Sequence, residues 1–267
     1  MKRFDYESKT WGVNTVSSAP TELGALRLKY CLEALKGVRG KILDVGCGAG
    51  GFTKAIKRSR PDLEVWGVDI SVNSVRRARK NPQRVNFSLG SAYKLPFKDN
   101  SFDAVVLFDV IEHLDKPDKS LREIYRTLKK GGLFHCFVPT EGEIFAYTKW
   151  LNNLGWRAKE KYAGHIQNFT KDVLVNVLGK EKLKVIDTKW SGHFLYQAAD
   201  AVYFTILLLR GKNIGFGVES LVSLRKKTLL FRMLGLMSGA VAIGSFIESS
   251  LFQKIPGFGV HLTAKKL

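Results

Sequence analysis

Cysteine is scarce in this chain, and its three residues lie far apart. Cys31, Cys47 and Cys136 are odd in number and lack the paired spacing of a zinc site or a disulfide framework. We therefore expect no disulfide and a reducing compartment. The first residues, MKRFDYESKTWGVN, carry charges but no apolar run behind them, so no secretory signal peptide is expected and the expected location is the cytoplasm.

Acidic residues are also in short supply. Only 24 Asp and Glu stand against 43 Lys and Arg, which gives a formal net charge of +19. A charge of this size attracts polyanions through a long-range field that weakens as salt rises. Nucleic acid and anionic lipid both fit this description, although runs such as Arg225–Lys227 are more often solvated helix faces than binding sites.

Apolar segments of strand length alternate with helix-like stretches along most of the chain. The 267 residues, 45% of them apolar, suffice for one well-buried core with an accessory region. Strands that are apolar on both faces are typical of a mainly parallel sheet with crossover helices, and Pro117 suits the first turn of one such helix. The expected strands are 41–46, 64–70, 85–90, 102–110, 133–139 and 184–190.

The carboxyl ends of these strands define one expected ligand crevice. In an open α/β sheet the ligand lies beyond these ends, where the strand order reverses. This rule brings together the glycine turn after the first strand, Asp69 after the second, Gly90 and Ser91 after the third, and Phe108-Asp109 after the fourth. The candidate motifs therefore share one pocket.

The glycine turn in ILDVGCGAGGF (42–52) fits two cofactors by spacing alone. Its glycines allow positive φ and a close approach of the backbone to a ligand, with the N–H groups of the next helix facing it. Asp44, an acid inside an apolar strand, would repel the pyrophosphate of a dinucleotide and therefore argues against NAD. Asp69 suits two ribose hydroxyls in either cofactor.

Four segments resemble, in order, the motifs of class I S-adenosylmethionine (SAM) dependent methyltransferases. They are ILDVGCGAGGF, VWGVDIS, KLPFKDNSFDAVVLFDVIEHL and LKKGGLF, and the resemblance is to the broad group that includes the ubiquinone- and menaquinone-biosynthesis type. It covers roughly 38–140 and resumes weakly at 164–178. It implies a doubly wound, mainly parallel, Rossmann-like seven-stranded α/β sheet, with FGVHLTAKKL (258–267) as an antiparallel last strand.

The resemblance also implies SAM as the cofactor, S-adenosylhomocysteine as its product, and no metal. It assigns the methionine half of SAM to the first strand and its turn, the ribose to Asp69, the adenine to Ile70, and backbone contacts to Phe108. Ser91, followed by Ala92, stands where the family often has an acid, and its hydroxyl can still accept a hydrogen bond from the adenine amino group. The residues expected at the methionine half are Asp44, Gly46, Cys47, Gly48 and Gly50.

Methyl transfer from a sulfonium needs little acid–base chemistry, because the methyl group is already activated. In-line displacement depends on aligning the acceptor and excluding water. A base is needed only for a hydroxyl or an enolisable carbon, and the candidate catalytic residues are Glu112 and His113 after the fourth strand and His165 in a segment that resembles the family's "GH…FT". Glu112 could instead have a purely structural role, and His113 could cap a helix or stack at its start. His135 fits a core or rim position.

The last quarter of the chain contains two long apolar segments, 194–209 and 228–247, with one charge each. A membrane-spanning hairpin is disfavoured, because it would put the basic loop between them on the side away from the catalytic domain. We expect a pair of helices at a membrane interface, held by apolar area and basic residues; ordinary core helices of a helical subdomain are the alternative. Because the block precedes the last strand, it would hang over the mouth of the active site and admit a lipid-like acceptor.

These observations divide the chain into four parts. We expect an N-terminal arm or lid containing Tyr6 and Trp11, a SAM-binding methyltransferase domain, a hydrophobic helical insertion that forms a cap or membrane interface, and the final strand. The respective ranges are 1–37, 38–192, 193–257 and 258–267.

The expected function is SAM-dependent methyl transfer to a small or amphipathic acceptor such as a lipid, a quinone precursor or a lipid-linked sugar. The expected setting is the cytoplasm, with peripheral binding to the inner face of an anionic membrane as a possibility, and the oligomeric state stays open. An RNA methyltransferase is one alternative; it is favoured by charge but lacks an RNA-binding motif and an N/D-P-P-Y/F motif after the fourth strand. An NAD-type oxidoreductase and a non-catalytic SAM-binding protein are the others.

Overall fold

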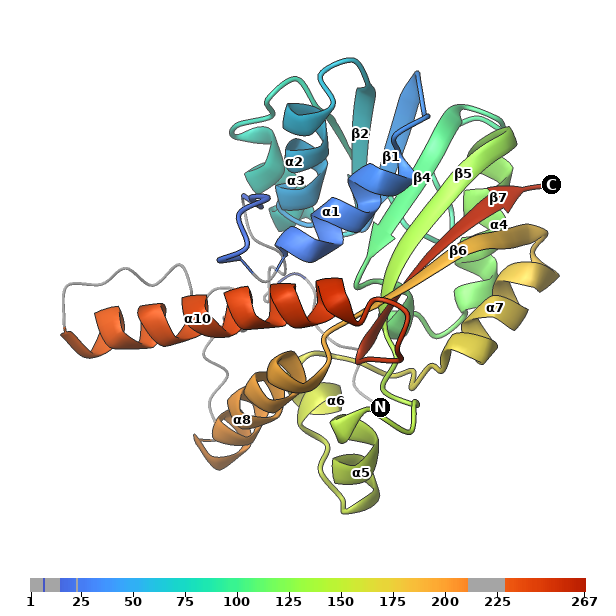
Figure 1. Cartoon of the computed structure of the whole chain (residues 1–267). Coiled ribbons are helices and arrows are strands. Elements are labelled where there is room, and N and C mark those ends of the chain that lie inside the picture. The colour runs from blue at the N-terminus through green and yellow to red at the C-terminus, as the bar shows by residue number, and fades with distance from the viewer. Residues whose placement is uncertain (1–6, 8–14, 23, 211–228) are drawn as a thin grey trace.

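The core of the protein is one mixed sheet with the strand order β3-β2-β1-β4-β5-β7-β6 (Figure 1). The computed structural model describes residues 7, 15–22, 24–210 and 229–267. β7 pairs antiparallel with both neighbours and the other pairs are parallel, so the predicted topology is confirmed. The strands are β1 Lys41–Val45, β2 Glu64–Asp69, β3 Asn86–Leu89, β4 Phe102–Phe108, β5 Leu128–Pro139, β6 Leu183–Ser191 and β7 Gly259–Lys266.

The central strands are buried on both faces, as their sequences predict. Along β1, Leu43 packs into the core on one side of the sheet and Ile42 into the core on the other, because successive strand residues point to opposite faces. In β4, Val105 and Val106 divide in the same way. The parallel ladder therefore stands between two apolar layers, and only its ends reach polar surroundings.

Helices cover both faces of the sheet. One layer comprises α1 (Ala25–Ala34), α2 (Gly51–Ser59) and α3 (Val72–Arg79), and the other α4 (Pro117–Thr127) and α7 (Lys171–Lys180) (Figure 1). The N-termini of α3 and α7 carry side-chain caps. Ser71 Oγ accepts a hydrogen bond from Ser74 N at 3.1 Å, and Thr170 Oγ1 accepts one from Val173 N at 3.3 Å. Pro117 lies in the first turn of α4, as predicted.

Two strand boundaries differ from the sequence prediction by more than one residue. β4 ends at Phe108 instead of continuing to Val110, because Asp109 takes a positive φ of 52° that breaks the extended conformation. β5 begins at Leu128 instead of at 133, because Leu128 pairs with Phe102 across a register shift. Tyr6, Trp11 and Arg225–Lys227, which the sequence singles out, lie outside the described residues.

The two apolar segments near the C-terminus form α8 (Phe194–Arg210) and α10 (Leu229–Leu251), as predicted. The two helices contact each other, and a Cβ built at Gly244 of α10 would lie 2.7 Å from Leu195 Cδ1 of α8, so this glycine allows a close approach. With α5 (Tyr147–Asn153) and α6 (Ala158–Tyr162), they lie beyond the carboxyl ends of the parallel strands (Figure 1). Among the described residues, no helix is both long and apolar enough to cross a bilayer.

We expect a cavity at the centre of the sheet core to destabilise the protein strongly. Leu107 in β4 is fully buried, so Leu107→Ala should lower the free energy of unfolding by about 2–5 kcal/mol. Leu154, which is 85% exposed, is the matched control, and Leu154→Ala should change it by less than about 0.5 kcal/mol. Urea unfolding followed by circular dichroism measures both, and equal effects would contradict this account of the core.

Candidate active site

The turn between β1 and α2 has the backbone conformation that its glycines predict. Gly46, Gly48 and Gly50 have φ values of 76°, 53° and 82°, a region that side chains disfavour. At Gly46 the approach is also close, since a Cβ there would lie 2.3 Å from Val110 Cγ2. The N–H groups of Gly46 and Cys47 both donate to the Val68 carbonyl, at 2.8 and 3.0 Å, and so tie the turn to β2.

Asp69 joins this turn to the end of β2. Its carboxylate accepts hydrogen bonds from Gly48 N and Ser71 N, both at 2.8 Å, and the residue is half-buried. Burial raises the pKa of Asp69, although the two backbone donors oppose the shift. Beside it, the Glu7 carboxylate accepts from Val72 N at 2.7 Å at the start of α3. The predicted pairing of the glycine turn with a second carboxylate is therefore present.

Asp44 lies beneath the turn and is almost fully buried. Its carboxylate accepts a hydrogen bond from Thr53 Oγ1 at 2.6 Å. Burial raises the pKa of Asp44 to about 7, even though the Thr53 bond acts in the opposite direction and nearby Asp69 adds to the rise. The turn therefore lies above a buried carboxyl group whose pKa is close to neutral pH. A cationic group placed near Asp44 would favour its charged form.

The remaining predicted cofactor residues lie at the carboxyl ends of β1 to β4. Ile70 is 59% exposed, which leaves an apolar side chain open at the end of β2. Ser91 Oγ accepts from Tyr93 N at 3.2 Å, and Ala92 packs against the core. Phe108 stacks on Phe52 of α2 with 4.5 Å between ring centroids. The cofactor roles of Cys47, Ile70, Ser91, Ala92 and Phe108 stay predictions.

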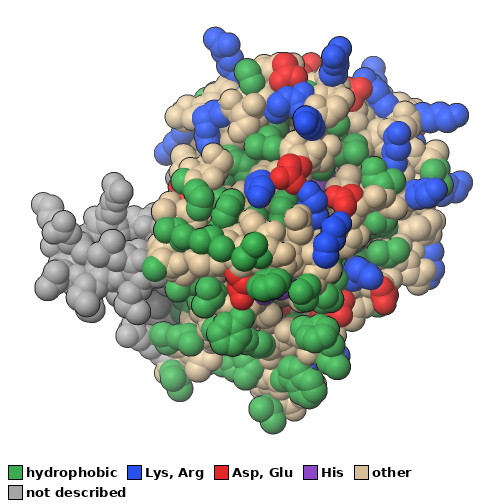
Figure 2. All heavy atoms as spheres, viewed as in Figure 1, with side chains coloured by type: hydrophobic (Ala, Val, Ile, Leu, Met, Phe, Trp, Pro, Cys, Tyr) green, Lys and Arg blue, Asp and Glu red, His purple; other side chains and the backbone are tan. Residues whose placement is uncertain are grey.

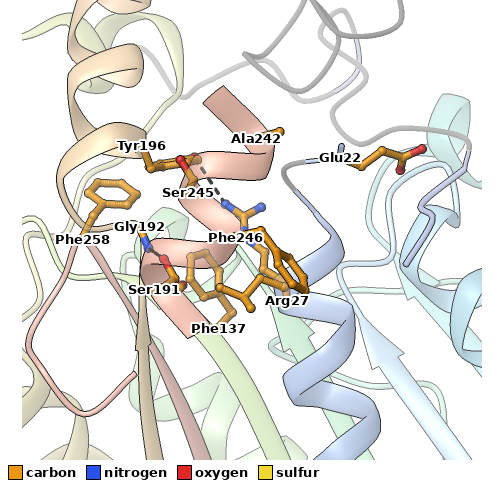
Figure 3. A pocket seen from close by; sticks show the side chains of 12 residues that line it. Glu22, Arg27, Phe137, Ser191, Gly192, Tyr196, Ala242, Ser245, Phe246 and Phe258 are labelled. Carbon is orange, nitrogen blue, oxygen red and sulfur yellow. Dashed lines mark hydrogen bonds between the residues drawn. The ribbon is translucent and has the colours of Figure 1, made fainter. Parts of the chain in front are cut away.

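A pocket opens beyond the ends of β5 and β6 (Figure 3). Arg27 of α1 reaches into it, where its guanidinium lies 2.8 Å from Asp109 Oδ2 and 4.2 Å from the centroid of the Phe137 ring. Apolar side chains dominate the rest of the lining, and α10 supplies one wall. The other lining residues are Glu22, Leu26, Ser191, Gly192, Tyr196, Ala242, Ser245, Phe246, Ser249 and Phe258.

The three predicted catalytic residues come together, but outside this cavity's lining. Glu112, His113 and His165 each offer a ligand-type atom within 4.8 Å of the other two. Burial raises the pKa of Glu112 to about 8 and lowers that of His113 to about 3. Burial opposes the charge on His165 too, but Glu141 outweighs it and raises the pKa of His165. Their catalytic role stays a prediction.

A buried ion-pair network continues from this cluster into the helical region. His165 Nδ1 lies 2.7 Å from Glu141 Oε1, and Lys159 Nζ lies 3.1 Å from the same oxygen and 2.6 Å from Asp200 Oδ2. Burial acts to raise the pKa of Glu141, but the opposite effect of Lys159 and His165 is larger and brings the pKa down to about 2. Asp200, the single charge of an apolar segment, thus pairs inside the protein.

Several site residues escape prediction from the sequence. Arg27 looks like an ordinary basic residue of an amphipathic helix, and only its burial and its bond to Asp109 set it apart. Tyr196 and Ser245 reach the cavity because β6 and β7 bracket the insertion, which no local motif encodes. His135 is buried in β5, as expected for a core position.

Comparisons with known proteins agree with this geometry. A family model described as "Methyltransferase domain" matches residues 43–136. Demethylmenaquinone methyltransferase of Thermotoga maritima is 36% identical over 161 residues, which cover 54% of this chain and 70% of the relative. The ubiquinone/menaquinone biosynthesis C-methyltransferase UbiE of Desulfotalea psychrophila is 36% identical over 121 residues, covering 43% of this chain and 49% of the relative.

Solved structures support the fold. A geranyl diphosphate methyltransferase in complex with GPP and sinefungin has a TM-score of 0.55 at 15% identity, covering 91% of this chain and 78% of that one. The [4+2]-cyclase SpnF has a TM-score of 0.57 at 21% identity, covering 90% of this chain and 80% of that one.

The chain belongs to the class I SAM-dependent methyltransferases of the ubiquinone/menaquinone type. It spans less than half the length of three curated relatives that it matches, at 42%, 49% and 43%.

Asp44 predicts a stability that depends on pH. Because the pKa of Asp44 in the folded protein is raised from 3.8 to about 7, the stabilisation from its bound proton is complete below about pH 4 and is lost as the pH rises to about 7. Asp44→Asn removes this titration, so the variant should gain stability relative to the wild type between about pH 4 and pH 7, by on the order of a few kcal/mol. Urea unfolding without cofactor measures the difference.

Asp118→Asn is the matched control for this experiment. Asp118 is exposed on α4 and pairs with Arg122, so its replacement should change the free energy of unfolding by less than about 1 kcal/mol. Wild-type and Asp44→Asn curves that run parallel over this range would contradict the raised pKa.

Proposed function

We propose that this protein transfers the methyl group of SAM to a lipid-like acceptor by in-line displacement. The observation that carries the proposal is the apolar cavity beyond the carboxyl ends of β5 and β6, with Ala242 and Phe246 of α10 in its wall. Arg27 links this cavity through Asp109 to the end of β4, next to the glycine turn. Donor and acceptor would then meet along one edge of the sheet.

The cofactor would lie on the turn between β1 and α2. Asp69 would accept hydrogen bonds from the ribose hydroxyls, and the cationic methionine end would lie above Asp44. Ile70 would pack on the adenine, while Ser91 and the Phe108 backbone would contact its edge. The partial positive charge at the start of α2 would hold the carboxylate of the methionine moiety.

The cavity favours an acceptor with an apolar body and a polar group at one end. Its apolar lining would exclude water around a bound acceptor, and displacement from a sulfonium depends on alignment and on the exclusion of water. The Arg27–Asp109 pair and the hydroxyls of Ser191 and Ser245 offer polar contacts at the boundary. The names of two relatives, which refer to ubiquinone or menaquinone, support a quinone precursor within this acceptor class.

Within this proposal the chain divides as the sequence suggests. Residues 38–192 would bind the cofactor, 1–37 would cover it, 193–257 would form the cap, and 258–267 would close the sheet. Proton transfer by Glu112, His113 or His165 would be needed only for a hydroxyl or an enolisable carbon acceptor. Because all three are outside the lining of the cavity, alignment carries the proposed reaction and a base is secondary.

An exposed apolar surface supports delivery of this acceptor from a membrane. Large apolar side chains gather over α5, α6, α8 and α10 in the lower half of Figure 2. The surface includes Trp150, Leu154, Val202, Ile247 and Leu251, which are 54–85% exposed. Together with the net charge of +19, it fits an anionic bilayer, into which the apolar residues would insert while basic residues meet head groups.

A pocket-filling substitution tests the acceptor site. Ala242 is 2% exposed and lines the cavity, so Ala242→Trp should reduce methylation at least 10-fold, because the indole would occupy the acceptor's space. The measurement is transfer of radiolabel from SAM to a lipid extract, with SAM binding followed by calorimetry. Ala240→Trp, at an exposed position of the same helix, is the control and should keep activity.

Three outcomes would count against the proposal. One is unchanged labelling by Ala242→Trp. Another is label that enters an RNA extract instead of lipid, which would favour the alternative based on charge. The third is absence of SAM binding by the wild type, which would remove methyl transfer altogether.

Acidic substitutions on the apolar surface test the membrane contact. The double variant Val202→Glu/Ile247→Glu should lose at least 10-fold in co-sedimentation with phosphatidylglycerol vesicles, because it buries two carboxylates next to anionic head groups. Ile186→Glu, at a 54% exposed position of β6 outside this surface, is the control. Equal sedimentation of the wild type, the double variant and the control would overturn the contact. Binding that occurs only at low salt and is the same for the wild type and the variants would also overturn it.

A further inference from the structure

We propose that Glu112, His113 and His165 bind one divalent transition-metal ion. One ligand atom from each residue lies within 4.8 Å of the other two. Two imidazoles and one carboxylate form a ligand set that holds Zn²⁺ or Fe²⁺ and leaves further coordination positions open. Since metal–ligand bonds are about 2.0–2.2 Å long, side-chain movements of about 1 Å would close the set on an ion.

Both imidazoles are anchored through Nδ1. His113 Nδ1 lies 3.0 Å from the Gly164 carbonyl oxygen, which can only accept, so this nitrogen carries the proton. His165 Nδ1 lies 2.7 Å from the Glu141 carboxylate, which fixes the same tautomer. In each neutral ring the lone pair is then on Nε2, and this pattern of an anchored Nδ1–H is typical of metal-bound histidine.

The Glu112 carboxylate supplies an observation independent of the histidines. The side chain is completely buried, and neither oxygen has a hydrogen-bond partner among the described residues. Its Oε1 lies 3.9 Å from His113 Nε2. A buried carboxylate without partners is costly, and a coordinated cation would satisfy it.

The backbone holds the two contributing segments together. The N–H groups of Ile166 and Gln167 both donate to the Glu112 carbonyl at 3.1 Å, and Gln167 Nε2 donates to the Leu114 carbonyl at 3.0 Å. These bonds join the turn after β4 to the segment before α7. The ligand positions are therefore fixed by the fold, and ion binding would need only side-chain adjustment.

Formal charges around the cluster favour a dication. Glu112, Glu141 and Asp200 are buried carboxylates, and Lys159 is the buried ammonium group that pairs with two of them. When Glu112 is ionised and both histidines are neutral, the group holds two excess negative charges, which one divalent ion would balance. Protonation of the cluster is the competing way to neutralise it, and direct ion binding distinguishes the two.

Equilibrium dialysis of the untagged, chelator-treated full chain with Zn²⁺ or Co²⁺ tests the site. We expect one ion per chain and a rise in the thermal midpoint on binding. Glu112→Gln and His165→Gln should each weaken binding at least 100-fold, and Glu141→Gln, which loses the anchor of His165, about 10- to 100-fold. His193→Gln is the control, because His193 bonds instead to Ser249 and the Ile255 carbonyl.

Wild-type protein alone also decides the question, in case a variant does not fold. Zn²⁺ should shift the imidazole nitrogen resonances of two of the five histidines, and Co²⁺ should give absorption bands of a nitrogen- and oxygen-ligated site. Failure of the wild type to bind either ion, shifts at other histidines, or full binding by folded Glu112→Gln and His165→Gln would overturn the proposal. No readout uses methyl transfer, so the two proposals fail separately.

Discussion

The antiparallel insertion of β7 between β5 and β6 is the constraint on which the active-site region depends. β6 runs parallel to β1 through β5 and ends at Ser191, at the carboxyl edge, and β7 begins at the same edge with Gly259. Any chain between these two residues must therefore leave and return at the edge where ligands bind in open α/β sheets. This path places α8 and α10 over the cavity, and the backbone ladder fixes the placement independently of helix sequence.

The fold could be predicted from the sequence where local signals and the sheet period agree. The apolar strands β1 and β4 and the glycine turn between β1 and α2 carry their conformation in their residue types, because buried parallel strands need apolar side chains on both faces and positive φ favours glycine. The start of β5 could not be predicted. Its first residues, LKKGG, look like a turn, and they extend the strand because Leu128 finds a partner in Phe102.

The candidate site divides along the same line between local and long-range information. Asp44 and Asp69 stand in fixed positions relative to the glycine turn, so a motif is enough to find them. Arg27 reaches Asp109 from a helix that precedes the sheet, and Ser245 reaches the cavity from the insertion. Such contacts depend on the packing of distant elements, and a single sequence contains no periodicity or spacing that reports them.

The short stretch from Phe108 to His113 couples three parts of this edge. Phe108 stacks on Phe52 at the start of α2, beside the glycine turn, and Asp109 holds Arg27 at the cavity. Three residues further on, Glu112 and His113 enter the buried cluster with His165. Asp109 adopts a positive φ, which costs energy in a residue other than glycine, so tertiary contacts such as the Arg27 pair must hold it there. A change in this stretch would therefore affect the glycine turn, the cavity and the cluster together.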